Sequence, residues 1–188
     1  MVFIIPGELI AFLTFPGVII HEIAHRFFCD MYKVKVFAAN YFNIGSKTAG
    51  YVIHENTTNH SGTATFLIAT GPLWINSILG SLILLPNMLI ENTPYDLPYY
   101  TSSVMTNFIF TVNSWIGYSI LFHAIPSQKD LDVKGHIKQF PLPLKIIYCF
   151  LRPIAFLCNM DYVGFFITIG YVWIISHLFS GLYTSVML

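Results

Sequence analysis

Long apolar runs alternate with shorter polar segments along the chain. A helix that crosses a membrane needs about 20 mostly apolar residues, and four runs are long enough: residues 2–28, 62–90, 103–125 and 162–182. A shorter apolar run at residues 144–159 suits an interfacial helix or one half of a hairpin. We therefore predict an all-α polytopic membrane protein with about four to six transmembrane helices.

Prolines, glycines and mixed segments refine this pattern. Pro6 and Pro16 interrupt the first run, which predicts one kinked helix or a short piece followed by a second helix from Pro16. Gly71-Pro72 predicts a break in the second run. Residues 30–61 mix apolar and polar positions and predict a short β-hairpin or re-entrant loop at the membrane surface. We find no internal repeat, and we predict a single membrane-embedded domain over residues 1–188.

Composition supports a lipid environment. The 188 residues are 55% hydrophobic and only 10% charged, whereas soluble domains are about 25% charged. Nine basic and nine acidic residues cancel, so no electrostatic basis exists for binding nucleic acid. Three scattered cysteines do not make a disulfide framework. The lipid bilayer is therefore an expected partner, and composition leaves the oligomeric state open.

The basic residues predict the orientation. All nine Lys and Arg lie in residues 26–47 and 129–152, and the acidic turn at 91–100 contains none. If the spans alternate in direction, both basic regions face one side, which the positive-inside rule makes the cytoplasm. Lys47 should then face the cytoplasm and Asp96 the opposite side. The first long apolar run ends on the cytoplasmic side in this arrangement.

The sequence His21-Glu22-Ile23-Ala24-His25 carries the strongest chemical signal. Histidines at positions i and i+4 share one helix face, so both rings can bind one Zn²⁺ ion. Glu22 lies beside the first ligand, where it can act as a general base. This composition gives roughly 0.005 chance matches to the pattern in such a chain. The alternative is a pair of helix histidines capped by a carboxylate, but ionisable residues near a membrane helix are typically functional.

A catalytic zinc site needs a third protein ligand. Asp130 and Asp132 reach the same membrane depth as the histidines if the spans alternate, and Glu55 lies in a polar loop on the same side. Cys29, four residues beyond His25, is rotated too far to converge and suits a buried core position. On a helix that begins after Pro126, only one aspartate can face the histidines, and Asp130 lies closer to the helix start.

Asp130 also has a structural alternative. Ser127-x-x-Asp130 after a proline resembles a helix capping box, in which the carboxylate would bind the backbone. The two roles are expected to be compatible only if the carboxylate turns away from the cap. We therefore predict His21, His25 and Asp130 as the zinc ligands, with Asp132 as the competing candidate.

These segments together resemble the site-2 protease family, which comprises intramembrane zinc metalloproteases of the M50 type. The resemblance rests on HEIAH, on Gly71-Pro72-Leu73-Trp74-Ile75-Asn76 and on His123-Ala124-Ile125-Pro126 followed by Asp130, and it covers roughly residues 15–132. The family pattern usually has Asn at the place of His123 and Gly after the distal Asp, so this chain resembles a small, divergent member. The resemblance implies one zinc ion and cleavage of a membrane-embedded or membrane-proximal protein or peptide. The distribution of basic residues predicts that the active site lies toward the cytoplasm.

The remaining candidates have two interpretations each. Asn76 and His123 are expected to bind substrate or the developing oxyanion, or to form interhelical hydrogen bonds. In the family a sheet near the site pairs with substrate, so residues 33–55 are either such a hairpin or a surface connector. Two other functions remain open: a non-proteolytic membrane protein with a structural zinc site, and a metal-handling or transport protein.

Overall fold

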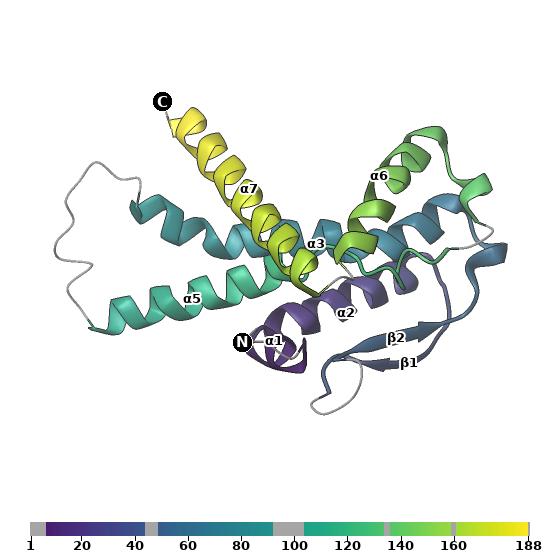
Figure 1. Cartoon of the computed structure of the whole chain (residues 1–188), viewed down its shortest axis with the longest axis horizontal. Helices are drawn as coiled ribbons and strands as arrows, with labels where there is room; N and C mark the ends of the chain where they lie inside the picture. Colours follow the sequence, from purple (N-terminus) through teal and green to yellow (C-terminus); the bar gives the residue numbers. More distant parts are fainter. Residues whose placement is uncertain (1–6, 44–48, 92–103, 134–135, 159–160, 188) are drawn as a thin grey trace.

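The computed structural model describes residues 7–43, 49–91, 104–133, 136–158 and 161–187. The fold is mostly helical with one small sheet (Figure 1). The elements in chain order are α1 (Gly7–Leu13), α2 (Phe15–Met31), β1 (Val36–Asn40), β2 (Tyr51–His54), the 3-10 helix η1 (Thr57–Asn59), α3 (Gly62–Glu91), α5 (Val104–Phe122), the 3-10 helix η2 (Ile137–Gln139), α6 (Leu142–Cys158) and α7 (Asp161–Met187).

The first apolar run forms two helices. α1 ends at Leu13 and α2 begins at Phe15, with Pro16 in its first turn. Proline is favoured there because the first N–H groups of a helix have no partner inside the helix. The Thr14 carbonyl accepts the Gly17 N–H at 3.0 Å across the junction. Of the two predicted arrangements, the short piece followed by a second helix is therefore the one adopted.

The predicted break at Gly71-Pro72 is wrong, because α3 continues through Pro72 and also contains Pro86. Proline has no N–H, so Pro72 leaves the carbonyl four residues earlier, that of Ile68, without its helical donor. Another helix supplies the donor, since His25 Nδ1 lies 2.7 Å from the Ile68 oxygen. The missing bond inside α3 is thus replaced by a bond to α2.

The predicted hairpin is confirmed. β1 and β2 pair antiparallel, with Ala38 opposite Ile53 and Asn40 opposite Tyr51, and the register shifts between Val36 and Ala38. Both strands contact α2, and Figure 1 shows the hairpin lying along that helix. The hairpin therefore covers one side of the helix that carries the HEIAH sequence.

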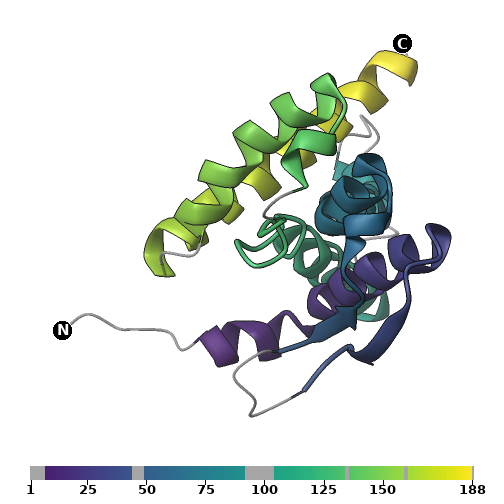
Figure 2. The same cartoon turned by 90° about the vertical axis from the view of Figure 1, so that its right-hand side faces the viewer.

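Helices α2, α3 and α5 pack against one another and form the centre of the fold. Figure 2 shows α6 and α7 on one side and the hairpin on the other, with the segment after α5 between them. That segment is anchored by Leu131, which is buried in a cluster with Phe66 and Tyr148. The Tyr148 hydroxyl donates to the Leu131 carbonyl at 2.7 Å. This packing holds the residue next to Asp130 in place.

The number of membrane spans is lower than expected in the part of the chain that the structure describes. There one helix, Gly62–Asn87 within α3, is long and apolar enough to cross a membrane by length and composition, and half of its apolar window is buried inside the protein. α2 and α6 have 17 residues each, short of the about 20 that a hydrocarbon core needs. Lys47 and Asp96, which carry the predicted orientation, lie outside the described residues.

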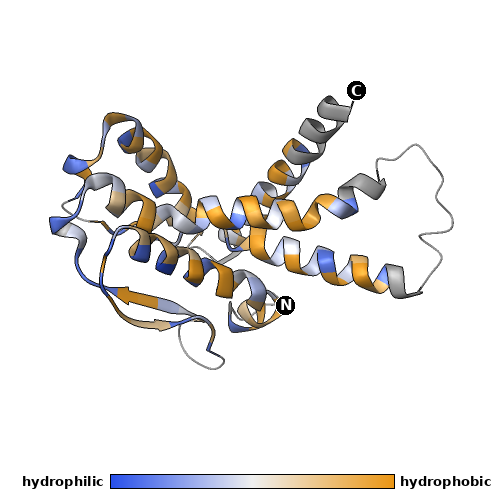
Figure 3. Cartoon of the chain, turned by 180° about the vertical axis from the view of Figure 1, so that it is seen from behind, coloured by the Kyte–Doolittle hydropathy of each residue, from blue (hydrophilic) through white to orange (hydrophobic). Residues whose placement is uncertain are grey.

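Many large apolar side chains nevertheless face outward. Apolar residues dominate α3 and α5 in Figure 3. Side chains that are more than half exposed on these helices and on α7 include Ile78, Leu82, Phe108, Ile109, Phe166, Trp173, Ile174 and Leu178. Large apolar side chains exposed in this number are consistent with contact to lipid or to another protein.

Candidate metal centre and cavity

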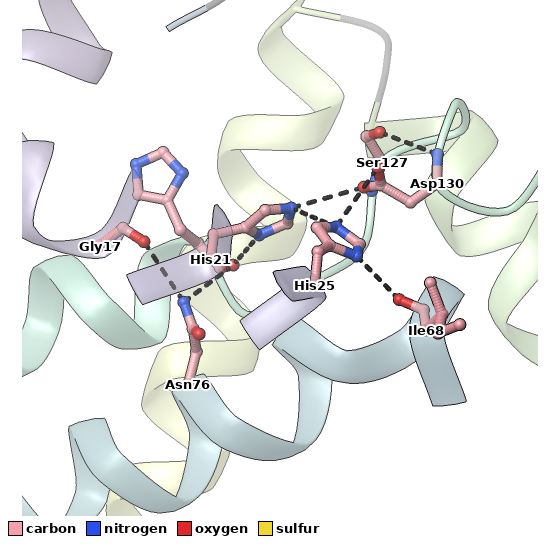
Figure 4. A network of polar contacts seen from close by, with 8 residues as sticks. Gly17, His21, His25, Ile68, Asn76, Ser127 and Asp130 are labelled. Atoms are coloured by element: carbon pink, nitrogen blue, oxygen red, sulfur yellow. Dashed lines mark hydrogen bonds and ion pairs between the residues drawn. The ribbon is translucent and has the colours of Figure 1, made fainter. Parts of the chain in front are cut away.

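Two histidines from α2 and one aspartate from the segment after α5 meet at one point (Figure 4). His21 and His25 are one helical turn apart, and their Nε2 atoms lie 3.2 Å from each other. His25 Nε2 lies 3.4 Å from Asp130 Oδ1, and His21 Nε2 lies 3.5 Å from Asp130 Oδ2. The structure therefore brings the three predicted ligands together, although Asp130 lies more than 100 residues after the two histidines in sequence.

Hydrogen bonds assign the proton on each histidine ring. His21 Nδ1 lies 2.7 Å from the His123 carbonyl, and His25 Nδ1 lies 2.7 Å from the Ile68 carbonyl. A carbonyl oxygen only accepts, so each Nδ1 carries a proton and donates it. In a neutral ring the Nε2 atom then carries the lone pair. Two such lone pairs directed at one point repel each other unless a cation or a proton lies between them.

The segment that carries Asp130 is a turn, so the helix on which the choice of Asp130 over Asp132 rests does not form there. Within this turn the Ser127 N–H donates to Asp130 Oδ2 at 2.7 Å, and the Asp130 N–H donates to Ser127 Oγ at 3.3 Å. These are the reciprocal bonds of a capping box without the helix. The same carboxylate also faces both histidines. The expectation that the two roles need opposite orientations is therefore wrong.

The charge state of Asp130 suits metal binding. Burial of the carboxylate favours its protonated form, but when a proton and not a metal cation lies between the rings, the positive charge of His25 and hydrogen bonds from both histidine rings outweigh burial. The pKa of Asp130 is therefore held well below its ordinary range. Metal ligands must be deprotonated, and the Asp130 carboxylate meets this requirement at neutral pH.

The donor atoms lie close enough together to share one zinc ion. Zinc binds histidine nitrogen at about 2.0–2.1 Å and carboxylate oxygen at about 2.0–2.2 Å, so neighbouring ligand atoms of a tetrahedron lie about 3.3–3.5 Å apart. The two histidine nitrogens are 3.2 Å apart, and each lies 3.4–3.5 Å from a different carboxylate oxygen of Asp130. One donor atom from each of the three residues can be chosen so that all lie within 4.8 Å of one another. Each histidine also donates a hydrogen bond from its Nδ1–H group to a backbone carbonyl. Such a bond is the usual support for metal-binding histidines. His21, His25 and Asp130 could therefore hold one zinc ion.

Glu22 lines a cavity of about 1340 Å³ that also contains the three donor side chains. The hairpin residues 49–52 form part of its wall. The hairpin approaches Glu22 closely, because a Cβ atom added to Gly50 would lie 2.7 Å from Glu22 Cγ. Only glycine therefore fits at position 50 with Glu22 in its present orientation. The predicted general base, three metal-ligand candidates and an accessible volume are thus adjacent.

Asn76 and His123 hold backbone groups next to the metal-ligand candidates. Asn76 is fully buried, and its Nδ2 atom lies 3.2–3.4 Å from the carbonyls of Gly17, Ile120 and His123. The Thr14 hydroxyl donates to Ile10, so His123 Nε2 donates to Thr14 at 2.7 Å. This geometry favours the interhelical interpretation for Asn76. The ring of His123 lines the cavity, so contact with a substrate stays a prediction.

The other ligand candidates lie apart from the three-residue group. Cys29 is buried in a core cluster with Phe28 and Ile68, as expected. Glu55 accepts the Lys35 N–H at 3.1 Å and pairs with His60 at 3.2 Å. Asp132 is exposed and lines the cavity, but it does not belong to the group of converging donor atoms in the described chain.

The carbonyl of Ile68 and the close approach of Gly50 are two features that the sequence analysis missed. The proline four residues after Ile68 is a sequence signal for a free carbonyl in a helix. Gly50 had no such signal, because its constraint comes from a side chain on another element. Comparisons with protein-family models, with curated proteins and with solved structures each find no match to this chain.

Proposed function

We propose that the protein is an integral-membrane zinc metalloprotease that cleaves peptide bonds of membrane-embedded or membrane-proximal substrates. The observation that carries the proposal is the convergence of two histidine Nε2 atoms and one carboxylate, with donor atoms within 4.8 Å of one another, at a cavity that Glu22 also lines. This proposal agrees with the resemblance of HEIAH and the distal aspartate segment to the site-2 protease family.

The donor set favours catalysis over a structural metal. Structural zinc sites normally have four protein ligands, whereas catalytic sites have three and keep one position open. Within the described chain three residues form the group, and it borders a cavity. His21, His25 and Asp130 would hold the zinc ion. When bound, zinc supplies Lewis-acid activation of the water nucleophile and of the scissile carbonyl.

Glu22 would move the proton during hydrolysis. Its carboxylate would accept a proton from the attacking water and then deliver it to the amine of the leaving peptide. The amide of a helical substrate is hydrogen-bonded and sterically closed to attack, so the substrate must unwind before it enters the cavity. The hairpin wall beside Glu22 would then lie along the unwound segment.

The membrane assignment rests on apolar surface and chain composition. One helix passes the length and composition criterion for a span, and α5 and α7 expose large apolar side chains. We propose that the chain crosses the bilayer several times, with α7 and α5 joining α3 as spans. In this arrangement the metal centre, at the end of α5, lies toward the cytoplasmic side.

The test uses purified full-length protein in proteoliposomes together with a set of single-span peptides. The peptides carry Gly or Asn near one end of the span, where the helix unwinds most easily. We expect cleavage that stops on removal of zinc with a chelator and returns on its addition. The Glu22→Gln variant should bind zinc and leave every peptide intact. Undiminished cleavage by that variant, or a wild-type protein without bound zinc, would refute the proposal.

A further inference from the structure

The strongest additional signal is the way in which α3 supports a metal-ligand candidate on another helix. Pro72 lies inside α3, and a proline inside a helix removes the hydrogen bond to the carbonyl four residues earlier. That carbonyl belongs to Ile68, which is buried against α2. A buried carbonyl without a partner is costly, so this position requires an external donor.

His25 is that donor. His25 is buried, with only 7% of the residue exposed. Its Nδ1 atom lies 2.7 Å from the Ile68 oxygen. With an ordinary residue at position 72, a backbone N–H would compete for the same oxygen. Because proline has no N–H, the Ile68 carbonyl is available to His25, and the bond keeps Nε2 free to face His21 and Asp130.

Gly71 makes the bond geometrically possible. A Cβ atom at this position would lie 2.6 Å from Phe28 Cδ2 and 3.2 Å from the Ala24 carbonyl oxygen. Both of these residues belong to α2 and flank His25. The absence of a side chain therefore lets α2 approach α3 within reach of the Ile68 carbonyl.

We propose that Gly71 and Pro72 form a positioning pair that reserves the Ile68 carbonyl for His25 and so sets the tautomer and orientation of this zinc ligand. The inference rests on the metal site of the proposed function. It assigns to the Gly-Pro dipeptide a role in metal affinity that neither residue performs by direct contact with the ion. Pro72 lowers the stability of α3, because proline destabilises a helix interior, and in return it raises the affinity of the site for metal.

These two effects predict opposite changes in the Pro72→Ala variant, one in its unfolding temperature and one in its zinc affinity. Alanine restores the N–H and the hydrogen bond inside α3, so the zinc-free protein should unfold at a temperature equal to or above that of wild type. His25 then loses exclusive use of the carbonyl, and loss of such an outer contact typically weakens metal binding by about 10- to 100-fold. A general loss of folding would instead lower both the unfolding temperature and the zinc affinity.

Pro86 provides the matched control because it lies in the same helix. Its free carbonyl is that of Leu82, fourteen residues and about 21 Å along the helix from Ile68. Pro86→Ala should change helix stability in the same direction and leave zinc affinity unchanged. Zinc affinity is measured on the detergent-solubilised full-length protein by competition with a chromophoric chelator, and unfolding is followed in the zinc-free protein.

Pro72→Ala should raise the zinc Kd about 10- to 100-fold without loss of thermal stability. Pro86→Ala should leave the zinc Kd unchanged. The inference is overturned if Pro72→Ala binds zinc within threefold of wild type, if its zinc-free form is less stable than wild type, or if Pro86→Ala weakens zinc equally. A wild-type protein that binds no zinc would refute the proposed function. Tight zinc binding by both wild type and Pro72→Ala would refute only the positioning role.

Discussion

Replacement of Asp130 by asparagine separates the metal role of this residue from its structural role. The Ser127 N–H donates to Asp130 Oδ2 at 2.7 Å, and an asparagine carbonyl can accept the same bond, so the turn should persist. The variant loses the negative charge and the anionic ligand. Structural zinc sites bind with about 10–16 kcal/mol in total, which is about 3–5 kcal/mol for each ligand if three share it equally. We therefore expect the zinc Kd to rise by roughly three orders of magnitude.

The matched control is Asp132→Asn, which removes the same charge two residues away. Asp132 lies outside the converging group in the described chain, so zinc affinity should stay within a few-fold of wild type. Chelator competition on purified protein measures both values, and circular dichroism checks that both variants keep wild-type helix content. A zinc Kd within tenfold of wild type for Asp130→Asn would contradict the assignment. Loss of zinc by Asp132→Asn alone would move the ligand to that residue, and full binding by both would direct the search to Glu55.

Four further predictions address the base, the hairpin, the core and the orientation. Glu22→Gln should retain one zinc ion and abolish peptide cleavage, because the proposed role of Glu22 is that of a general base and not of a ligand. Gly50→Ala should displace Glu22 and reduce kcat about 100-fold with unchanged zinc content, since a displacement of about 1 Å can cost that much; an unchanged kcat would argue against the contact. Asn76→Ala should lower the free energy of unfolding by about 1–3 kcal/mol in denaturant titrations, because buried carbonyls lose their donor. Cysteines at positions 47 and 96 should react with impermeant reagents from opposite sides of the membrane, and reaction from one side would contradict the predicted orientation.

The helices and the HEIAH geometry could be predicted because they depend on local periodicity. A four-residue spacing places His21 and His25 on one face of any α-helix, and alternation of apolar and polar residues is sufficient to indicate the hairpin. The short helix before Pro16 follows from proline preference at helix starts. In each case the pattern that indicates the element is local in the sequence, even though the hairpin strands pair residues 11 to 18 positions apart.

The break predicted at Pro72 and the helix considered after Pro126 are both absent, and the two cases have a common cause. A break at Pro72 and a helix after Pro126 are both reasonable from local preference alone. In the structure the free carbonyl of Ile68 is bound by His25, 43 residues earlier in the chain. The segment after Pro126 forms a turn in which Leu131 is buried among core residues. The Leu131 carbonyl accepts a hydrogen bond from the Tyr148 hydroxyl. Tertiary contacts therefore outweigh local preference at both positions, and a single sequence does not reveal such partners.

The two histidines obtain their supporting carbonyls by different means. His21 donates to the carbonyl of His123, which follows the last residue of α5, where the helix ends and carbonyls have no helical donor. His25 donates to a carbonyl in the middle of α3, where only a proline four residues later provides the same freedom. A buried metal-binding histidine needs an acceptor for its second nitrogen, and a bundle of continuous helices offers few. The ends and the prolines of neighbouring helices are therefore the positions at which such a site can be built, and Pro72 and the end of α5 lie at these positions in this chain.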